Sequence, residues 1–133
     1  MTYTASSAPL YYLASPYRLY PAGAEQAFID VCAIAGHLIE TGVMVYSPIA
    51  HCHPIAAHSD MDLHRYELWM PFDLLMLARC DGLIIAHMQG WEESVGIAEE
   101  VKYFMALNRP IFDLDIKTLC LRARTMIPHI DFE

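Results

Sequence analysis

Three short runs of apolar and aromatic residues limit the fold more than any other feature of this chain. Residues 10–14 (LYYLA), 43–46 (VMVY) and 82–87 (GLIIAH) lack the alternation of polar and apolar residues that marks a strand with one solvated face. Such runs are typical of strands buried on both faces, which occur in parallel sheets covered by helices. A shorter run at residues 110–112 predicts a fourth strand.

Helical patterns separate these runs. Apolar residues recur at three-and-four spacing over residues 24–41, and Gly42 follows as a C-terminal cap. Further helices are expected over residues 61–79, where Pro71 marks a kink or a fresh first turn, over residues 93–107, and after Asp113. Because crossovers between parallel strands are right-handed, this order predicts an α/β fold: a small doubly wound parallel sheet of four to five strands flanked by helices.

Length and composition predict one domain. The 133 residues fit a single core, which we place at residues 10–133 after a flexible N-terminal tail at residues 1–9. Hydrophobic residues make up 56% of the chain and charged residues 18%, which excludes intrinsic disorder. No apolar stretch reaches the roughly 20 residues of a spanning helix, and no signal peptide is visible, so we expect a cytoplasmic protein without a membrane partner.

The charge balance points to a small ligand. Lys and Arg number 8 against 16 Asp and Glu, so the formal net charge is −8. That charge repels a phosphate backbone and argues against nucleic acid as the partner. The scattered cysteines, without a CxxC pair, are expected to be reduced core thiols: Cys32, Cys52, Cys80 and Cys120.

Ligands of doubly wound sheets bind beyond the carboxyl ends of the strands, which directs attention to the loops after Ala14, Tyr46 and His87. In the predicted helix before the third strand, Asp73 has only apolar neighbours one turn away: Trp69, Met70, Met76 and Leu77. Burying a carboxylate in such surroundings costs free energy unless the group is paired or takes part in the protein's chemistry. The alternative is an exposed or helix-capping aspartate.

Glu100 is a second candidate. It falls at the margin of the buried stripe of its predicted helix, whereas Glu99 falls on the solvated side. Six residues earlier, Ser94 offers a hydroxyl and backbone N–H groups at a helix N-terminus, which suit an anion. In the alternative interpretation Ser94 is only an N-cap and Glu100 a boundary charge.

Residues 49–59 have no clear period and predict a long functional loop. The histidines and acids there and just beyond match no established metal-ligand spacing, so we expect substrate hydrogen bonding or ordinary polarity, and neither a metal nor another cofactor. These residues are His51, His53, His58, Asp60, Asp62 and His64. Arg18, just past the first strand, is either a phosphate contact or a solvated loop residue.

Four motifs carry a resemblance to a known family. They are residues 12–17 (YLASPY), 73–81 (DLLMLARCD), 90–100 (GWEESVGIAEE) and 106–111 (ALNRPI). In this order and spacing the chain resembles the nucleoside 2-deoxyribosyltransferase-like superfamily, especially its small bacterial and phage members of undefined activity, over about residues 11–111. The expected sheet is flavodoxin-like. A doubly wound domain this small, with 56% hydrophobic residues, is expected to form a homodimer or a dimer of dimers. We expect that assembly to hide aromatics that look exposed in the sequence: Tyr66, Trp69 and Phe72.

By resemblance, Glu100 is the nucleophile that attacks the anomeric carbon of a nucleoside, Asp73 works near the departing base, and Tyr12 orients the nucleophile. The chemistry agrees, because cleaving an N-glycosidic bond needs a carboxylate at the sugar and a proton donor at the base. An aspartate among apolar side chains should have a raised pKa, which suits that donor.

One position departs from the transferases proper, which carry an aspartate six residues before the glutamate. Ser94 stands there instead, and Ser-x-Gly-x-x-x-Glu, with Gly96, is the pattern of relatives that hydrolyse nucleoside 5′-monophosphates and hold the phosphate with the serine. The remaining candidate substrate contacts are Ser15, Arg18, His53, Gly90 and Trp91. Trp91 could equally be a packing residue. The transferases also use residues from the C-terminus of a neighbouring subunit.

Three hypotheses follow. The first is an N-glycosidase or glycosyl-transferring enzyme acting on a nucleoside or nucleoside 5′-monophosphate. The second is a nucleotide-binding or signalling module that keeps the fold without turnover. The third is a metal-dependent hydrolase built on the histidine-rich segment.

Overall fold

A five-stranded sheet forms the centre of the molecule in the computed structural model, which describes residues 7–62 and 65–124. The strand order is β2-β1-β3-β4-β5, in which the first four strands are parallel and β5 is antiparallel to β4. The strands are β1 (Tyr11–Ala14), β2 (Val45–Tyr46), β3 (Gly82–Ala86), β4 (Ile111–Leu114) and β5 (Leu121–Ala123). This is the flavodoxin-like order, so the predicted α/β doubly wound fold is confirmed.

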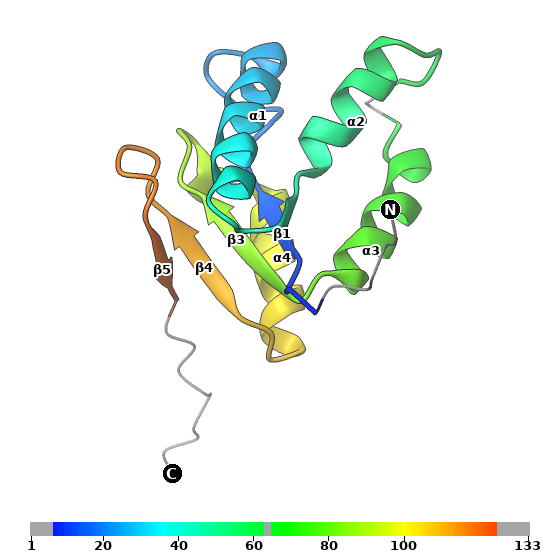
Figure 1. Cartoon of the computed structure of the whole chain (residues 1–133). Coiled ribbons are helices and arrows are strands. Elements are labelled where there is room, and N and C mark those ends of the chain that lie inside the picture. The colour runs from blue at the N-terminus through cyan, green and yellow to red at the C-terminus, as the bar shows by residue number, and fades with distance from the viewer. Residues whose placement is uncertain (1–6, 63–64, 125–133) are drawn as a thin grey trace, which may run out of the picture.

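Helices cover both faces of the sheet (Figure 1). The four α-helices are α1 (Ala24–Glu40), α2 (Pro48–Ala57), α3 (Tyr66–Arg79) and α4 (Val95–Ala106), and a 3-10 turn, η1 (Trp91–Glu93), precedes α4. α1 packs on one face, while α4 and the C-terminal part of α3 pack on the other. α2 and α3 together connect β2 to β3.

Alternation along the strands divides the core in two. Leu13 and Ile84 face α1, whereas Tyr12 and Leu83 face α3 and α4. All five residues of β3 are buried, as the unbroken apolar run predicts for a central strand. The side chain of Tyr12 therefore lies inside the protein, under α4, on the face opposite α1.

The expected loop at residues 49–59 is wrong, because most of it is helix α2. Ser47 caps this helix, its Oγ accepting the Ala50 N–H at 3.1 Å, and Pro48 fills the first turn, where its missing N–H costs nothing. Histidines and Pro54 hide the helical period, since the buried side of α2 is built from few apolar residues.

The helix expected after Asp113 is also wrong for the described residues. The Asp115 side chain accepts the N–H groups of Lys117 and Thr118 in a tight turn, and the chain returns as β5. Arg124 then pairs with Asp113 at 2.6 Å, which fastens the returning strand to β4. The C-terminal residues 125–133 and residues 1–6 of the expected tail lie outside the described residues.

Two further expectations need correction. Trp69 is buried within the chain, and Phe72 is partly buried, so of the three aromatics expected in an interface only Tyr66 is exposed. Cys120 is exposed and Cys32 only partly buried, so the cysteines are not all core residues; all four are free thiols.

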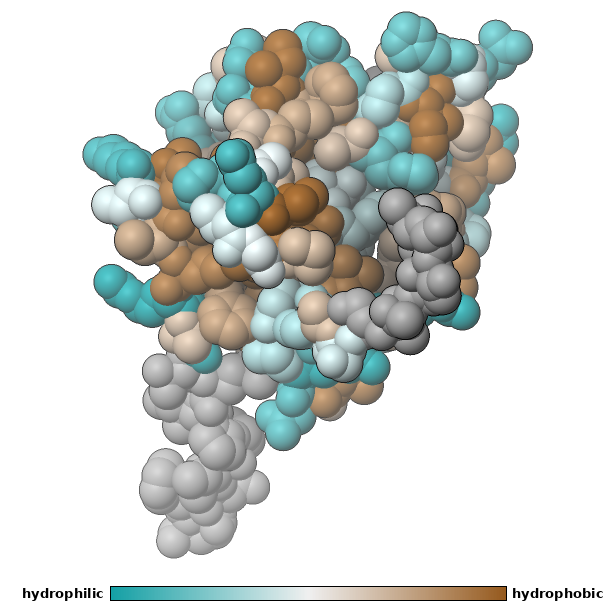
Figure 2. Space-filling view, in the orientation of Figure 1, coloured by the Kyte–Doolittle hydropathy of each residue, from teal (hydrophilic) through white to brown (hydrophobic). Residues whose placement is uncertain are grey.

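Other apolar side chains are exposed instead, and Figure 2 shows apolar patches along the side of the molecule where α2 and α3 lie. In the described part of the chain, no helix has the length and apolar character needed to cross a membrane.

Candidate active site

Glu100 of α4 meets Tyr12 of β1 beneath the helix. The two side chains are hydrogen bonded, with the Tyr12 hydroxyl as donor and the Glu100 carboxylate as acceptor. Tyr12 is only 2% exposed. Burial, followed by the negative charges of Glu100 and Asp73, raises the pKa of Tyr12, so its phenol keeps its proton and remains a donor.

Burial raises the pKa of Glu100 to about 8, against the opposing effect of the Tyr12 hydrogen bond, and the charge of Asp73 raises it further. Glu100 nevertheless keeps some solvent-accessible surface. A carboxyl that is largely desolvated yet reachable can hold either a proton or a charge near neutral pH, as a reacting group must.

Asp73 of α3 and Cys52 of α2 complete this cluster. Burial raises the pKa of Asp73, while its contact with Cys52 and the neighbouring His51 lower it. The Cys52 Sγ lies 3.8 Å from Asp73 Oδ1, and burial together with the Asp73 charge raises the pKa of the thiol to about 12. The thiol is thus a protonated donor facing the carboxylate.

Tyr46 closes the cluster from β2. Its backbone is in register with Tyr12, and the two rings lie 5.9 Å apart. Two carboxyls of raised pKa, one beside a phenol and one beside a thiol, therefore share a site built by β1, β2, α2, α3 and α4. Such a pair can divide nucleophile and proton-donor roles between its members.

The predicted difference between the adjacent glutamates of α4 is confirmed. The Glu99 side chain is 66% exposed and lies 3.4 Å from Lys102, whereas Glu100 turns toward the sheet. Asp73 is partly buried in the middle of α3, so it is neither an exposed aspartate nor a helix cap.

Ser94 caps α4, its Oγ accepting the Ile97 N–H at 3.2 Å. That bond uses an oxygen lone pair and leaves the hydroxyl proton available for a ligand. Gly96, in the first turn, is exposed, and a Cβ there would lie 3.8 Å from the Ser94 Oγ. The capping role of Ser94 is confirmed, and the geometry is compatible with an anion contact as well.

The loop after β3 lies against the loop after β1. Gly90 has φ +91°, a left-handed conformation that favours glycine, and a Cβ there would lie 3.9 Å from the Leu19 carbonyl oxygen. Trp91 stacks on His87 with ring centroids 4.0 Å apart, and His87 Nε2 lies 2.7 Å from Asp113 Oδ1. Trp91 therefore has a packing role.

Ser15 and Arg18 follow β1. The Ser15 Oγ is buried and has no hydrogen-bond partner among the described residues, which marks it as a group that awaits a ligand or a water molecule. Arg18 is exposed and its guanidinium lies over the Tyr66 ring, 4.7 Å from the centroid, so it contacts the start of α3.

The histidines at 51 and 53 lie on α2 and have ring partners. His51 stacks on Phe72 at 5.1 Å, and His53 is hydrogen bonded to Tyr17 and Glu25, each at 2.6 Å. Among the residues that the structure describes, no group of three or more His, Cys, Asp or Glu is arranged to hold a metal ion.

Four residues of this region were missed by the sequence analysis: Tyr17, Glu25, Tyr46 and Cys52. Tyr46 ends the second strand, where ligands of this fold bind, so a signal for it was present. Cys52 and His53 become neighbours of the site only because α2 is a helix, and that helix left no readable period.

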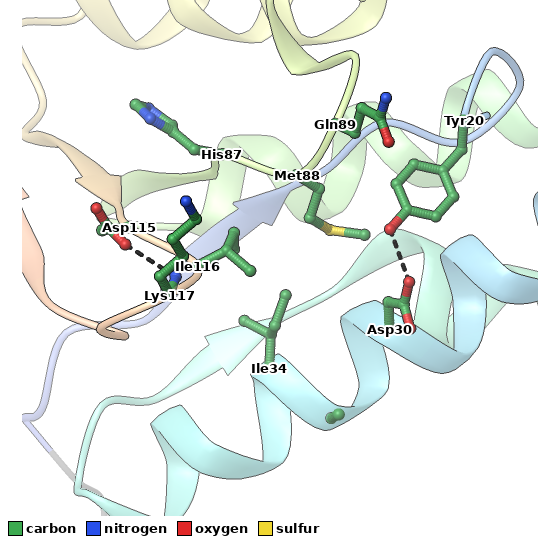
Figure 3. Close-up of a pocket in the computed structure, with 10 residues that line it drawn as sticks. Tyr20, Asp30, Ile34, His87, Met88, Gln89, Asp115, Ile116 and Lys117 are labelled. Atoms are coloured by element: carbon green, nitrogen blue, oxygen red, sulfur yellow. Dashed lines mark hydrogen bonds between the residues drawn. The ribbon is translucent and has the colours of Figure 1, made fainter. Parts of the chain in front are cut away.

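A surface pocket of about 560 Å³ lies on the opposite face, between α1 and the loops after β3 and β4. In Figure 3 the side chains of Ile34, Met88 and Ile116 converge at its centre, and the Tyr20 hydroxyl donates to Asp30 at 2.6 Å. Neither candidate catalytic carboxyl lines it. The carboxyl cluster, rather than this pocket, is the candidate active site.

Comparison with known proteins gives one family. No curated protein matches the chain. A family model described as "Domain of unknown function (DUF1937)" matches residues 9–115. Those residues include every element from β1 to β4 and all the side chains of the carboxyl cluster. Because this match covers most of the chain, the protein belongs to the DUF1937 family.

Proposed function

We propose that this protein cleaves or transfers the N-glycosidic bond of a nucleoside or, preferentially, a nucleoside 5′-monophosphate, with Glu100 as nucleophile. The observation that carries the proposal is the meeting of Glu100, Tyr12 and Asp73, two carboxyls of raised pKa and a buried phenol, on one side of the sheet. The four motifs that resemble the nucleoside 2-deoxyribosyltransferase-like superfamily support the same assignment of roles.

In the first step the Glu100 carboxylate forms a bond to the anomeric carbon as the bond from that carbon to the base nitrogen breaks. The transition state has oxocarbenium character, which a nearby carboxylate stabilises. The protonated Asp73 carboxyl gives its proton to the departing base, and the raised pKa of Asp73 favours that protonated form. The Tyr12 hydroxyl holds the attacking carboxylate in place through its hydrogen bond.

In the second step the ester between Glu100 and the sugar is broken. Attack by water gives the free sugar or sugar phosphate, and attack by a second base gives a new nucleoside or nucleotide. In both cases the Asp73 carboxylate takes a proton from the attacking group, which restores the starting state of both carboxyls.

Two features support a phosphorylated substrate. The Ser94 hydroxyl proton and the N-terminus of α4 offer hydrogen-bond donors and a positive dipole end to a phosphate. The buried Ser15 Oγ at the end of β1, which has no hydrogen-bond partner within residues 7–62 and 65–124, offers a further polar contact.

The test is base release. Purified protein is incubated with ribo- and deoxyribonucleotides and the matching nucleosides, and free base is followed by chromatography. We expect release from at least one 5′-monophosphate and faster release than from its nucleoside. Folded protein that releases no base from any substrate, with or without an added acceptor base, would contradict the proposal.

One observation favours a second candidate, a nucleotide-binding module without turnover. With a pKa of about 8, Glu100 is mostly neutral at pH 7 and is then a weak nucleophile but a good hydrogen-bond donor. Calorimetric titration distinguishes the two. Tight nucleotide binding that persists at pH 9 without any base release identifies the module.

A further inference from the structure

Three polar side chains from separate elements form a relay beside the carboxyl cluster. The Tyr17 hydroxyl, in the loop after β1, lies 2.6 Å from His53 Nδ1 on α2. His53 Nε2 lies 2.6 Å from a carboxylate oxygen of Glu25 on α1. Phe28 stacks on the His53 ring with centroids 4.6 Å apart. The imidazole is therefore held at both nitrogens and on one face.

The partners determine where the protons lie. An ionised carboxylate only accepts hydrogen bonds, so the Nε2 atom facing Glu25 carries the proton. The Nδ1 atom of a neutral imidazole is then an acceptor, and the Tyr17 hydroxyl donates to it. Burial and the charge of Glu25 raise the pKa of Tyr17, which keeps its phenol protonated.

In this state the Tyr17 oxygen has no proton left to offer to a ligand. Its lone pairs can only accept a hydrogen bond, so the relay converts a group that could donate or accept into an acceptor. Tyr17 is partly exposed, so a ligand can reach it.

Tyr17 lies on the Asp73 side of the candidate site. Cys52, next to His53 on α2, contacts Asp73 and is also close enough to Tyr17 to help raise the pKa of its hydroxyl. In the proposed reaction Asp73 serves the departing base. The ligand group closest to Tyr17 is then part of the base rather than of the sugar or the phosphate.

We infer that the Tyr17 hydroxyl accepts a hydrogen bond from an N–H group of the substrate's base, and that His53 and Glu25 are positioning residues that hold it as an acceptor. The inference rests on the proposed function and narrows its substrate class to nucleotides whose base carries such a donor, an exocyclic amine being the simplest.

The experiment compares paired nucleotides that differ only in that amine: adenine against unsubstituted purine, and cytosine against 2-pyrimidinone. The wild-type kcat/KM should be about three- to tenfold higher for the amine-bearing member, which is the usual value of one neutral hydrogen bond. Tyr17→Phe should abolish this preference, because it removes the acceptor and leaves the ring.

Two substitutions at His53 separate the ends of the relay. His53→Gln places an amide near Nε2 and keeps a donor for Glu25 but loses the Tyr17 contact, so the preference should disappear. His53→Asn places an oxygen near Nδ1 and keeps the acceptor for Tyr17, so part of the preference should return. Tyr20→Phe and His58→Gln are matched controls, because Tyr20 bonds to Asp30 on the other face and His58 is an exposed residue at the end of α2.

Equal losses on both members of a pair in Tyr17→Phe would mean a structural role only and would overturn the inference. The inference would also fail if Tyr20→Phe removed the preference.

A readout without turnover keeps the two proposals distinguishable. Nitrogen–proton correlation spectra of the His53 ring in the free protein should show the Nε2–H tautomer, and Glu25→Gln should weaken that preference. A dominant Nδ1–H tautomer overturns the relay whatever the activity. If the wild type releases no base, the proposed function fails, and calorimetric binding of the same nucleotide pairs to wild type and Tyr17→Phe then decides the acceptor role.

Discussion

The burial that raises the pKa of Glu100 also makes the folded protein less stable once this carboxyl is charged. The folded protein holds its proton up to a pKa of about 8, whereas an unfolded chain releases it near 4.5. Between these values the folded state binds one more proton than the unfolded state, so each rise in pH favours unfolding. The stability lost is greatest once the pH exceeds the folded pKa.

Glu100→Gln should therefore be more stable than the wild type at pH 8, by roughly 1–3 kcal/mol after allowance for partial exposure, and nearly equal to it at pH 4. Base release should fall by orders of magnitude, because the amide cannot attack the anomeric carbon. Urea unfolding at the two pH values and the chromatographic assay measure both effects.

The wild-type activity itself should have a bell-shaped pH profile with one limb near pH 8, the pKa of Glu100, because the mechanism needs Glu100 ionised and Asp73 protonated at the same time. Glu99→Gln is the control, since Glu99 is exposed and pairs with Lys102, and it should change neither the stability nor the rate of base release. A Glu100→Gln variant that still releases base at the wild-type rate would exclude Glu100 as the nucleophile.

Ser94 combines a cap with a proposed phosphate contact, and two substitutions separate these roles. Ser94→Ala should cost about 1 kcal/mol of stability through loss of the Ile97 contact, and should lower kcat/KM for a 5′-monophosphate about ten- to a hundredfold. Ser94→Asp still caps the helix and suits its dipole, so stability should be kept while the phosphate is repelled.

Calorimetry, together with kinetics on matched nucleosides and nucleotides, provides the comparison. Unphosphorylated nucleosides should be almost unaffected by either change. Should both variants lose activity equally on nucleosides and nucleotides, Ser94 is only a cap.

At the scale of elements, Gly82 sets how closely β1, β3 and the chain entering β4 approach one another. A Cβ at this position would lie 2.7 Å from the Pro110 carbonyl oxygen and 2.9 Å from the Tyr11 ring. That carbonyl accepts the Leu83 N–H at 2.9 Å, so it cannot move without weakening the strand pairing.

Gly82→Ala is expected to lower the free energy of unfolding by roughly 1–3 kcal/mol through overpacking. Gly36→Ala is the matched change in α1, where no atom lies within 4 Å of the new methyl group, and it should raise stability by about 0.5–1 kcal/mol by favouring the helix. Urea titration of both variants tests the pair. If both variants changed the free energy of unfolding equally and in the same direction, the close contacts around Gly82 would not explain the effect.

For the whole molecule, α3 presents an apolar outer side that is exposed in the described part of the chain. The side chains of Tyr66, Leu68, Met70, Leu74 and Leu75 are between 43 and 51% exposed. The same helix buries Trp69 and Leu77 against the rest of the chain. A helix that is apolar on both sides is typical of one buried between two bodies.

We predict that a second copy covers this surface, giving a homodimer or a dimer of dimers with two-fold symmetry. Leu74→Glu should shift the protein to the monomer in sedimentation at micromolar concentration. Ile39→Glu, a similarly exposed position at the end of α1, should leave the assembly intact. A wild-type protein that sediments as a monomer contradicts this prediction.

Local pattern determined much of the architecture. The unbroken apolar runs are strands because only a covered parallel sheet can bury both of their faces, and the rotation of 100° per residue separates Glu100 from Glu99 within one helix. Ser94 was recognisable as a cap because a cap depends on residues a few positions away.

Tertiary structure decided the rest. The apolar residues of α2 show little helical periodicity, but the segment is a helix because Ser47 caps it and it packs on the sheet. The turn at Asp115 brings the chain back as strand β5 in place of the expected last helix. The partners of Glu100 and His53 come from distant segments, which meet only after the crossovers close. Which side chains converge depends on the path of the connections, and local periodicity does not encode that path.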